Sequence, residues 1–238
     1  MYKQKKIIAI IPARGGSKRI PNKNIRDFCG KPMISYALEA ARDSALFDCI
    51  HVSTDSKKIA EATQKEGFDV DFMRTAELSD DHTPIMPVLK YVLEQYIDRG
   101  KYFDEVVLIM ACAPLIDAND LISASKVMNQ YNGTKQVLAI APFPVPVEWA
   151  FKFNDDGSLI PEQPGMFSVR SQDLGVKYYD AGIFCFMPVE HILSTDGAGS
   201  DDAYVGYKLP KSKAVDIDDQ DDWLFAEALY RGTHATKE

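Results

Sequence analysis

A strongly basic segment with two adjacent glycines, "IPARGGSKRIPNKN", occupies residues 11–24 directly after an apolar run. Gly15 and Gly16 allow positive φ and a close approach of the backbone, so that successive N–H groups can point at phosphate oxygens. Four basic side chains could supply the countercharge: Arg14, Lys18, Arg19 and Lys23. This combination predicts a polyphosphate ligand, although the same composition is also typical of a solvated surface turn.

The position of this segment favours phosphate binding over a plain turn. Ligands of parallel α/β sheets sit beyond the carboxyl ends of the strands, and the turn after the first strand is the usual phosphate site. The signatures GxxxxGK[ST] and GxGxxG are both absent, which removes the main indications of a P-loop ATPase and of a dinucleotide-binding enzyme.

A second group of functional candidates lies near the end of the chain, in "AVDID" at 214–218. We expect a strand end here, which would turn Asp216 and Asp218 to the same side. Two carboxylates so placed suit Mg²⁺, which completes its coordination with water and substrate phosphates. The alternative is that these acids, with Asp219 and its neighbours, only begin a helix whose dipole favours negative charge.

The hydrophobic pattern predicts the elements that must position both groups. Strands are expected at 7–11, 50–53, 70–72, 106–110, 137–141, 183–187 and 214–218. Helices are expected at 31–41, 56–65, 85–97 and 121–128, with a closing helix over 223–230 that Asp219 caps. The alternation of strand and helix predicts one α/β domain over residues 1–238, doubly wound around a mostly parallel, Rossmann-like sheet.

The alternation breaks after Pro142, where prolines punctuate aromatic residues. "DDG" at 155–157 is typical of a hairpin turn. We interpret 142–182 as an inserted arm that covers the site or pairs with a second subunit. Otherwise its aromatic side chains would form a costly exposed apolar surface: Trp149, Phe151, Phe153 and Phe167.

Composition narrows the class of protein. A net charge of −8 argues against nucleic acid as a partner, and the apolar runs are too short for a membrane span. The four cysteines show neither zinc-ligand nor disulfide-framework spacing, and no export signal is evident. We therefore expect a cytoplasmic protein with reduced thiols.

Five stretches of the sequence together resemble the CMP-sialic acid synthetase (acylneuraminate cytidylyltransferase) family. They are "IPARGGSKRIPNKN", "FCGKPMISYALEAA", "LFDCIHVSTDSKKIAEAT", "RTAELSDDHT" and "VDIDDQDDW", and the resemblance covers essentially the whole chain. Within the family, "FSVRSQDL" and "YYDAGIFCF" are more similar to the pseudaminic acid branch than to the neuraminate branch.

The resemblance implies a nucleotidyltransferase that transfers CMP from CTP to the anomeric hydroxyl of a nonulosonic acid, releasing pyrophosphate. It also implies a homodimer with an exchanged arm and a Mg²⁺ cofactor. Arg14 and Lys23 match residues at the reacting phosphates, and Asp216 and Asp218 match the Mg²⁺ ligands. The nucleotide-binding positions are Ala13, Arg14, Gly15, Gly16, Ser17, Lys18, Asn24 and Arg74. The acidic sugar is expected near Arg170 and Gln172.

One departure from the family pattern concerns the sugar. Met110, in "LIMACAPLI", stands where the neuraminate enzymes carry a glutamine; this loses a polar contact to the sugar and argues against neuraminate as the substrate. N-acetylneuraminic, legionaminic and Kdo acids stay open as substrates. A metal-dependent glycosyltransferase and a nucleotide-binding regulatory module are the alternatives from other classes.

Overall fold

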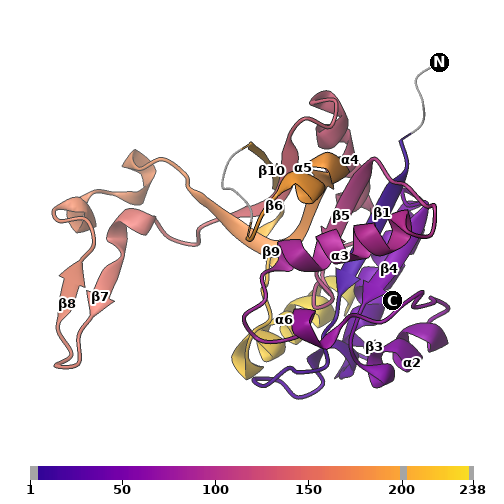
Figure 1. Ribbon diagram of the computed structural model, residues 1–238. Helices are drawn as coiled ribbons and strands as arrows, with labels where there is room; N and C mark the ends of the chain where they lie inside the picture. Colours follow the sequence, from indigo (N-terminus) through magenta and orange to yellow (C-terminus); the bar gives the residue numbers. More distant parts are fainter. Residues whose placement is uncertain (1–4, 199–202, 236–238) are drawn as a thin grey trace.

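A six-stranded sheet forms the centre of the computed structural model, which describes residues 5–198 and 203–235 (Figure 1). The strand order is β10-β6-β9-β5-β1-β4. Strand β9 pairs antiparallel with both of its neighbours, while the other pairings in this sheet are parallel. The strands are β1 (Ile7–Pro12), β4 (Cys49–Ser53), β5 (Glu105–Ile109), β6 (Gln136–Pro142), β9 (Tyr178–Pro188) and β10 (Tyr204–Lys208).

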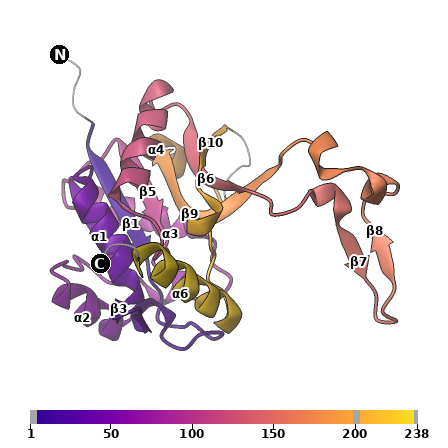
Figure 2. The same cartoon turned by 180° about the vertical axis from the view of Figure 1, so that it is seen from behind.

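Helices cover both faces of the sheet, as predicted (Figures 1 and 2). One face packs against α1 (Met33–Ser44), α2 (Lys57–Lys65) and α4 (Ala118–Gln130). The other packs against α3 (Ile85–Ile97) and α5 (Val189–Ser194). Strand β1 is apolar without alternation because both of its faces are buried. Ala9 and Ile11 belong to the hydrophobic cluster with α1, α2 and α4, and Ile8 and Ile10 belong to the one with α3 and α5.

A third cluster joins the two ends of the chain. Helix α6 (Gln220–His234) begins at Asp219, whose carboxylate accepts from the N–H groups of two residues of its first turn. Its Trp223 is 1% exposed and packs edge-on against Phe28, which follows the glycine loop. Because Val215 and Ile217 belong to the same cluster, the acidic segment before α6 lies against the beginning of the chain.

The segment between β6 and β9, residues 143–177, extends away from the sheet as an arm (Figures 1 and 2). Two short antiparallel strands, β7 (Phe151–Phe153) and β8 (Leu159–Pro161), form its hairpin. Gly157 adopts φ +83° in the turn, which confirms the hairpin expected at "DDG". Trp149 Nε1 donates to the Val169 carbonyl at 3.1 Å and ties the hairpin base to the returning chain.

Two predicted strands are wrong. Residues 70–72 form no ladder beside the edge strand β4, because their side chains rather than their backbone make the contacts. Residues 214–218 are extended but unpaired, and they are held by the burial of Val215 and Ile217. The sequence patterns also missed β10 and α5.

Two further observations concern the protein's class. No helix within the described ranges has both the length and the apolar character needed to span a bilayer. The cysteines at 29, 49, 112 and 185 are free thiols.

Candidate active site

The glycine loop and the acidic segment, far apart in sequence, meet at the carboxyl end of β1. Lys23 Nζ donates to the Ile217 carbonyl at 2.6 Å and lies 3.7 Å from Asp218 Oδ1. Arg19 Nη2 lies 3.0 Å from the same carboxylate oxygen. The structure therefore brings the two predicted groups together, through direct contacts between basic and acidic side chains.

Two cavities, of about 400 Å³ and about 260 Å³, share this region. Both are lined by Arg14, Lys23 and Asn24. Asp81 also lines both, and the first further includes Ser17, Lys18, Arg19 and Asp218. The second continues past Arg74 to the apolar residues Met110, Ala111 and Cys112 at the end of β5. Together they give a charged compartment next to a more apolar one.

Asp81 forms ion pairs with two basic side chains of the loop. Its carboxylate pairs with both Lys18 and Arg14, and these hydrogen bonds hold the pKa of Asp81 below its usual value. Arg14 Nη1 also donates to the Asp80 carbonyl at 2.9 Å. The contacts show that Arg14 and Lys18 can converge on one anionic group.

The glycines do not act as the sequence predicted. Neither Gly15 nor Gly16 has positive φ. The Gly15 N–H donates to Asp55 Oδ1 at 2.8 Å, so in this conformation it is not directed at a ligand. A Cβ at Gly15 would lie 3.0 Å from Ser56 Cβ, so the reason for glycine here is the close approach of the residue that precedes α2.

Two other predicted nucleotide-binding residues support the loop from within. The Ala13 N–H donates to the Ser53 carbonyl at 2.9 Å, and Ala13 is fully buried. Asn24, 8% exposed, donates from Nδ2 to the Arg14 carbonyl at 3.1 Å. These contacts fix the path of the backbone on either side of the glycines.

Arg74 is a buried cation beside the second cavity. It is 8% exposed, and its guanidinium donates to the Ser53 carbonyl at 2.6 Å and to Ser53 Oγ at 3.1 Å. Burial lowers the pKa of Arg74. Within the described ranges no carboxylate lies at ion-pair distance from it. A buried guanidinium without an acidic partner is costly unless an anionic ligand completes its surroundings.

Asp216 and Asp218 retain the alternation that the sequence predicted, although they do not lie in a strand. Val215 and Ile217 point into the core while Asp216 is exposed and Asp218 partly so. Although the residue as a whole is exposed, nearby protein atoms partly desolvate its carboxylate, and this desolvation, followed by the charge of Asp218, raises the pKa of Asp216. Their hard oxygen donors fit Mg²⁺, which needs one or two protein carboxylates rather than a complete protein cage. The described residues contain no group of three acidic, histidine or cysteine side chains arranged around a metal position.

A bulge in β9 makes room for Asp216. The register with β6 shifts between Leu138 and Ile140, and Gly182 in the bulge has φ +64°. A Cβ at Gly182 would lie 3.2 Å from Asp216 Oδ2, so a side chain there would press on the carboxylate. Bulges often re-aim side chains next to active sites, and this one borders the acidic pair.

Comparisons with known proteins show the family to which the chain belongs. A family model described as cytidylyltransferase matches residues 8–137. Pseudaminic acid cytidylyltransferase of Campylobacter jejuni is 37% identical, over 96% of this chain and 98% of the relative. The chain belongs to the cytidylyltransferase family. CMP-N,N'-diacetyllegionaminic acid synthase of Legionella pneumophila is 29% identical to this cytidylyltransferase, over 94% of the chain and 96% of the relative.

Solved structures show the same fold. CMP:2-keto-3-deoxy-manno-octonic acid synthetase complexed with CTP superposes with a TM-score of 0.68 at 18% identity, covering 96% of this chain and 99% of the other. A 4-diphosphocytidyl-2C-methyl-D-erythritol synthase from Anaerococcus prevotii gives a TM-score of 0.59 at 16% identity, over 96% of this cytidylyltransferase and all of the other chain. The predicted α/β nucleotidyltransferase fold is thereby confirmed.

The two predicted sugar-binding residues lie elsewhere in this cytidylyltransferase. Arg170 and Gln172 are exposed on the arm, away from their own glycine loop (Figure 1). Arg170 Nε lies 3.3 Å from Asp173 Oδ2, a neighbour on the same arm. The chain therefore does not bring these residues to its own glycine loop.

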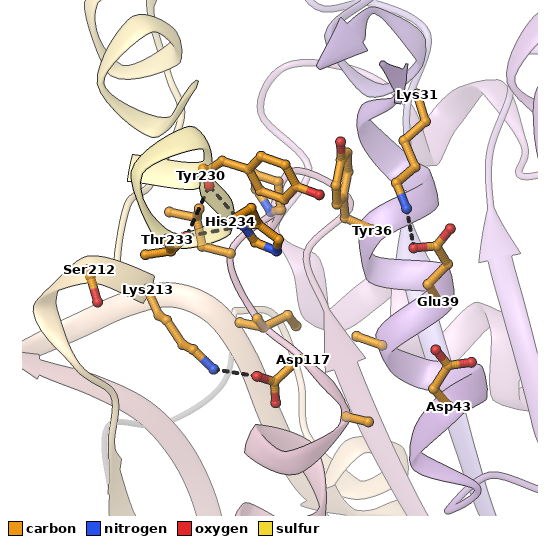
Figure 3. A pocket seen from close by; sticks show the side chains of 15 residues that line it. Lys31, Tyr36, Glu39, Asp43, Asp117, Ser212, Lys213, Tyr230, Thr233 and His234 are labelled. Carbon is orange, nitrogen blue, oxygen red and sulfur yellow. Dashed lines mark hydrogen bonds and ion pairs between the residues drawn. The ribbon is translucent and has the colours of Figure 1, made fainter. Parts of the chain in front are cut away.

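A further cavity, of about 320 Å³, lies between α1, α6 and the start of α4 (Figure 3). Its charged residues are already paired: Lys31 with Glu39, and Lys213 with Asp117 at 2.8 Å. Thr233 and His234 bond to carbonyls of α6 itself. Only two basic side chains other than His234 line this cavity, Lys31 and Lys213, so it lacks the cluster of four that lines the cavity beside Lys23.

Three residues of the site escaped the sequence interpretation. Asp55 and Asp81 hold the loop, and Cys112 lines the second cavity. Burial raises the pKa of the Cys112 thiol. The acidic "SDD" at 79–81 was the one available signal, since an anionic turn can pair with a basic loop; no local pattern marked Asp55 or Cys112.

Proposed function

We propose that this cytidylyltransferase transfers CMP from CTP to the anomeric hydroxyl of a nonulosonic acid, with pseudaminic acid as the preferred substrate. The 37% identity to a pseudaminic acid cytidylyltransferase, over nearly all of both chains, carries the proposal. Membership of the cytidylyltransferase family argues against the two alternative functions, a glycosyltransferase and a regulatory module. The free thiols support a cytoplasmic location for the reaction.

The triphosphate binds where the basic side chains converge. Arg14 and Lys18 exchange Asp81 for phosphate oxygens, and Arg74 contributes a third cation from the side of β4. Charge-assisted hydrogen bonds from guanidinium groups are directional, so they orient the α-phosphate as well as attract it. Repulsion between the incoming phosphates and Asp81 drives that carboxylate outward.

The reaction depends on charge stabilisation at the α-phosphate. Attack by the sugar hydroxyl develops negative charge on the phosphate oxygens, and preorganised cations lower the barrier. Lys23 is fixed for this role by the Ile217 carbonyl, with its side chain mostly buried. No protein base is assigned to the hydroxyl.

Asp216 and Asp218 are the residues that hold Mg²⁺ in this proposal. An ion held by these two carboxylates would supply charge neutralisation at the phosphates and would make an oxygen nucleophile easier to deprotonate. Asp218 now pairs with Arg19 and Lys23, so it can change partners when the nucleotide arrives.

The arm supports a homodimer. Several of its apolar side chains are exposed, including Phe153 at 76% and Phe167 at 67%, which is costly unless a partner covers them. Exchange of arms would also carry Arg170 and Gln172 of one copy to the nucleotide site of the other, where they would bind the acidic sugar.

Pyrophosphate release tests the proposed function. The purified protein is incubated with CTP, with and without Mg²⁺, and with pseudaminic, legionaminic, N-acetylneuraminic or Kdo acid. We expect the highest kcat/KM with pseudaminic acid and none without a divalent cation. Preference for another of these acids would reassign the substrate, and release with none of them would refute the reaction.

A further inference from the structure

Residues 71–73, which we name the 71–73 segment, run beside β4 without pairing to it and lead directly to Arg74. The Phe72 ring stacks on the imidazole of His51, with centroids 4.4 Å apart and planes inclined by 27°. His51 lies in β4 and is 1% exposed. The segment is therefore attached to the sheet through side chains.

Tyr96 of α3 holds the same segment by its hydroxyl. It donates to Asp71 Oδ2 at 2.8 Å and lies 3.1 Å from His51 Nδ1. A phenol has one proton, and the carboxylate takes it, so the Tyr96 oxygen must accept from Nδ1–H. His51 is then the Nδ1–H tautomer, and its Nε2 is buried without a partner in the described structure.

Each residue of the 71–73 segment has a further tether from α3 or the turn after it. Tyr91 donates to the Met73 carbonyl at 3.2 Å, and the Arg99 guanidinium lies 4.7 Å from the centre of the Phe72 ring. Lys101 lies 3.7 Å from Asp71 Oδ2. Such a density of specific contacts fixes the position of the segment more closely than apolar burial alone would.

Because Arg74 directly follows the 71–73 segment, the position of that segment helps to fix the position of Arg74. Its N–H donates to the Thr54 carbonyl at 2.8 Å and its guanidinium to Ser53, so one side is anchored on β4. The other anchor is the 71–73 segment. We propose that Tyr96 and His51 are positioning residues for Arg74, which hold its guanidinium in the geometry that binds the CTP phosphates. The inference rests on the proposed function, because it assumes that Arg74 contacts the nucleotide.

The proposal explains a polar network that stability alone does not require. The phenolic oxygen of Tyr96 has three polar partners inside a largely aromatic cluster: Cys49 Sγ, His51 Nδ1 and Asp71 Oδ2. A buried polar network destabilises the fold if any of its groups lacks a hydrogen-bond partner, and well-packed apolar side chains often stabilise a core equally well. What hydrogen bonds add is a defined geometry, which a phosphate-binding guanidinium needs.

The Tyr96→Phe variant tests this, with Tyr36→Phe as its matched control. Tyr36 is also a buried phenol, and it donates to the Phe28 carbonyl at 2.5 Å with no link to Arg74. We expect Tyr96→Phe to weaken CTP binding about 10-fold in calorimetry and to raise KM for CTP similarly, the loss expected for a misplaced charged hydrogen bond. The KM for the sugar should not change. Tyr36→Phe should lower the melting temperature comparably and leave CTP affinity as in the wild type.

A double-mutant cycle with Arg74→Lys separates positioning from general destabilisation. If Tyr96 acts through Arg74, the Tyr96→Phe change should cost little further CTP affinity once Arg74→Lys is present. Additive losses would overturn the inference, as would equal CTP affinity in Tyr96→Phe and the wild type. If Tyr96→Phe does not fold, Tyr91→Phe replaces it, because that change removes only the bond to Met73. Failure of the wild type to bind CTP would instead refute the proposed function.

Discussion

Replacing His51 by phenylalanine should flatten the loss of stability on acidification. His51 is 1% exposed in β4, and burial lowers its pKa from 6.5 to about 4. Of the charged groups around it, Asp71 opposes the shift, while Arg74 and Arg99 reinforce it. A phenylalanine ring retains the stack with Phe72 and has no proton to bind.

The sign follows from which state binds the proton. Unfolded His51 takes up a proton as the pH falls below about 6.5, whereas folded His51 resists until about pH 4, so acid favours the unfolded chain. Between pH 7 and pH 5 the difference amounts to about 1.8 kcal/mol, and it reaches about 3.4 kcal/mol below both pKa values.

Urea denaturation at pH 7, 6 and 5 measures the contribution of His51 protonation to the free energy of unfolding. The free energy of unfolding of the wild type should fall by about 1.8 kcal/mol more than that of His51→Phe over this range. Phe103→Leu is the control, because Phe103 packs edge-on against Tyr96 and the substitution leaves every titratable group in place. It should lower stability at each pH and keep the wild-type slope. Parallel pH profiles for His51→Phe and the wild type would refute the reasoning.

Three other predictions concern the site and the arm. Asp218→Asn should lower kcat by about 100-fold or more with an unchanged melting temperature, since it removes a partly exposed carboxylate from the metal position; near-normal pyrophosphate release would contradict the assignment. Gly182→Ala should destabilise the fold by roughly 1–2 kcal/mol because of the positive φ at this position. It should also raise the Mg²⁺ concentration for half-maximal activity, because the new Cβ displaces Asp216. An unchanged Mg²⁺ dependence would contradict the proposed link between Gly182 and Asp216. Phe153→Asp should convert a dimer into monomers in light scattering while circular dichroism stays the same, and a wild type that is already monomeric would remove the basis of the arm proposal.

Much of the fold was predictable because its signals are local. The apolar run at 7–11 and the periodic apolar positions of α3 each specify an element without knowledge of its neighbours. The two wrong strands mark the limit of that information. Residues 70–72 and 214–218 have strand-like composition, but whether such a segment pairs with a sheet depends on tertiary contacts that a local pattern does not show.

The site divides in the same way. The sequence indicated the basic loop and the acidic pair, because charge and glycine content are visible locally. It misjudged how the glycines work, since the partner of the Gly15 N–H, Asp55, lies in a different loop. Asp81 was missed as a partner for the same reason: its pairing with Lys18 joins residues far apart in the chain.

The geometry of the site depends on packing more than on its charges. Arg19 and Asp218 are both partly exposed, and an exposed ion pair contributes little to stability. The buried contact of Trp223 with Phe28 instead fixes the acidic segment against the basic loop, because full burial of large aromatic side chains is worth several times more. This division of labour suits a nucleotidyltransferase. Since the backbone is held by apolar contacts, the ion pairs of Arg14, Lys18 and Asp218 can break without loosening the fold, as the proposed binding of substrate and metal requires.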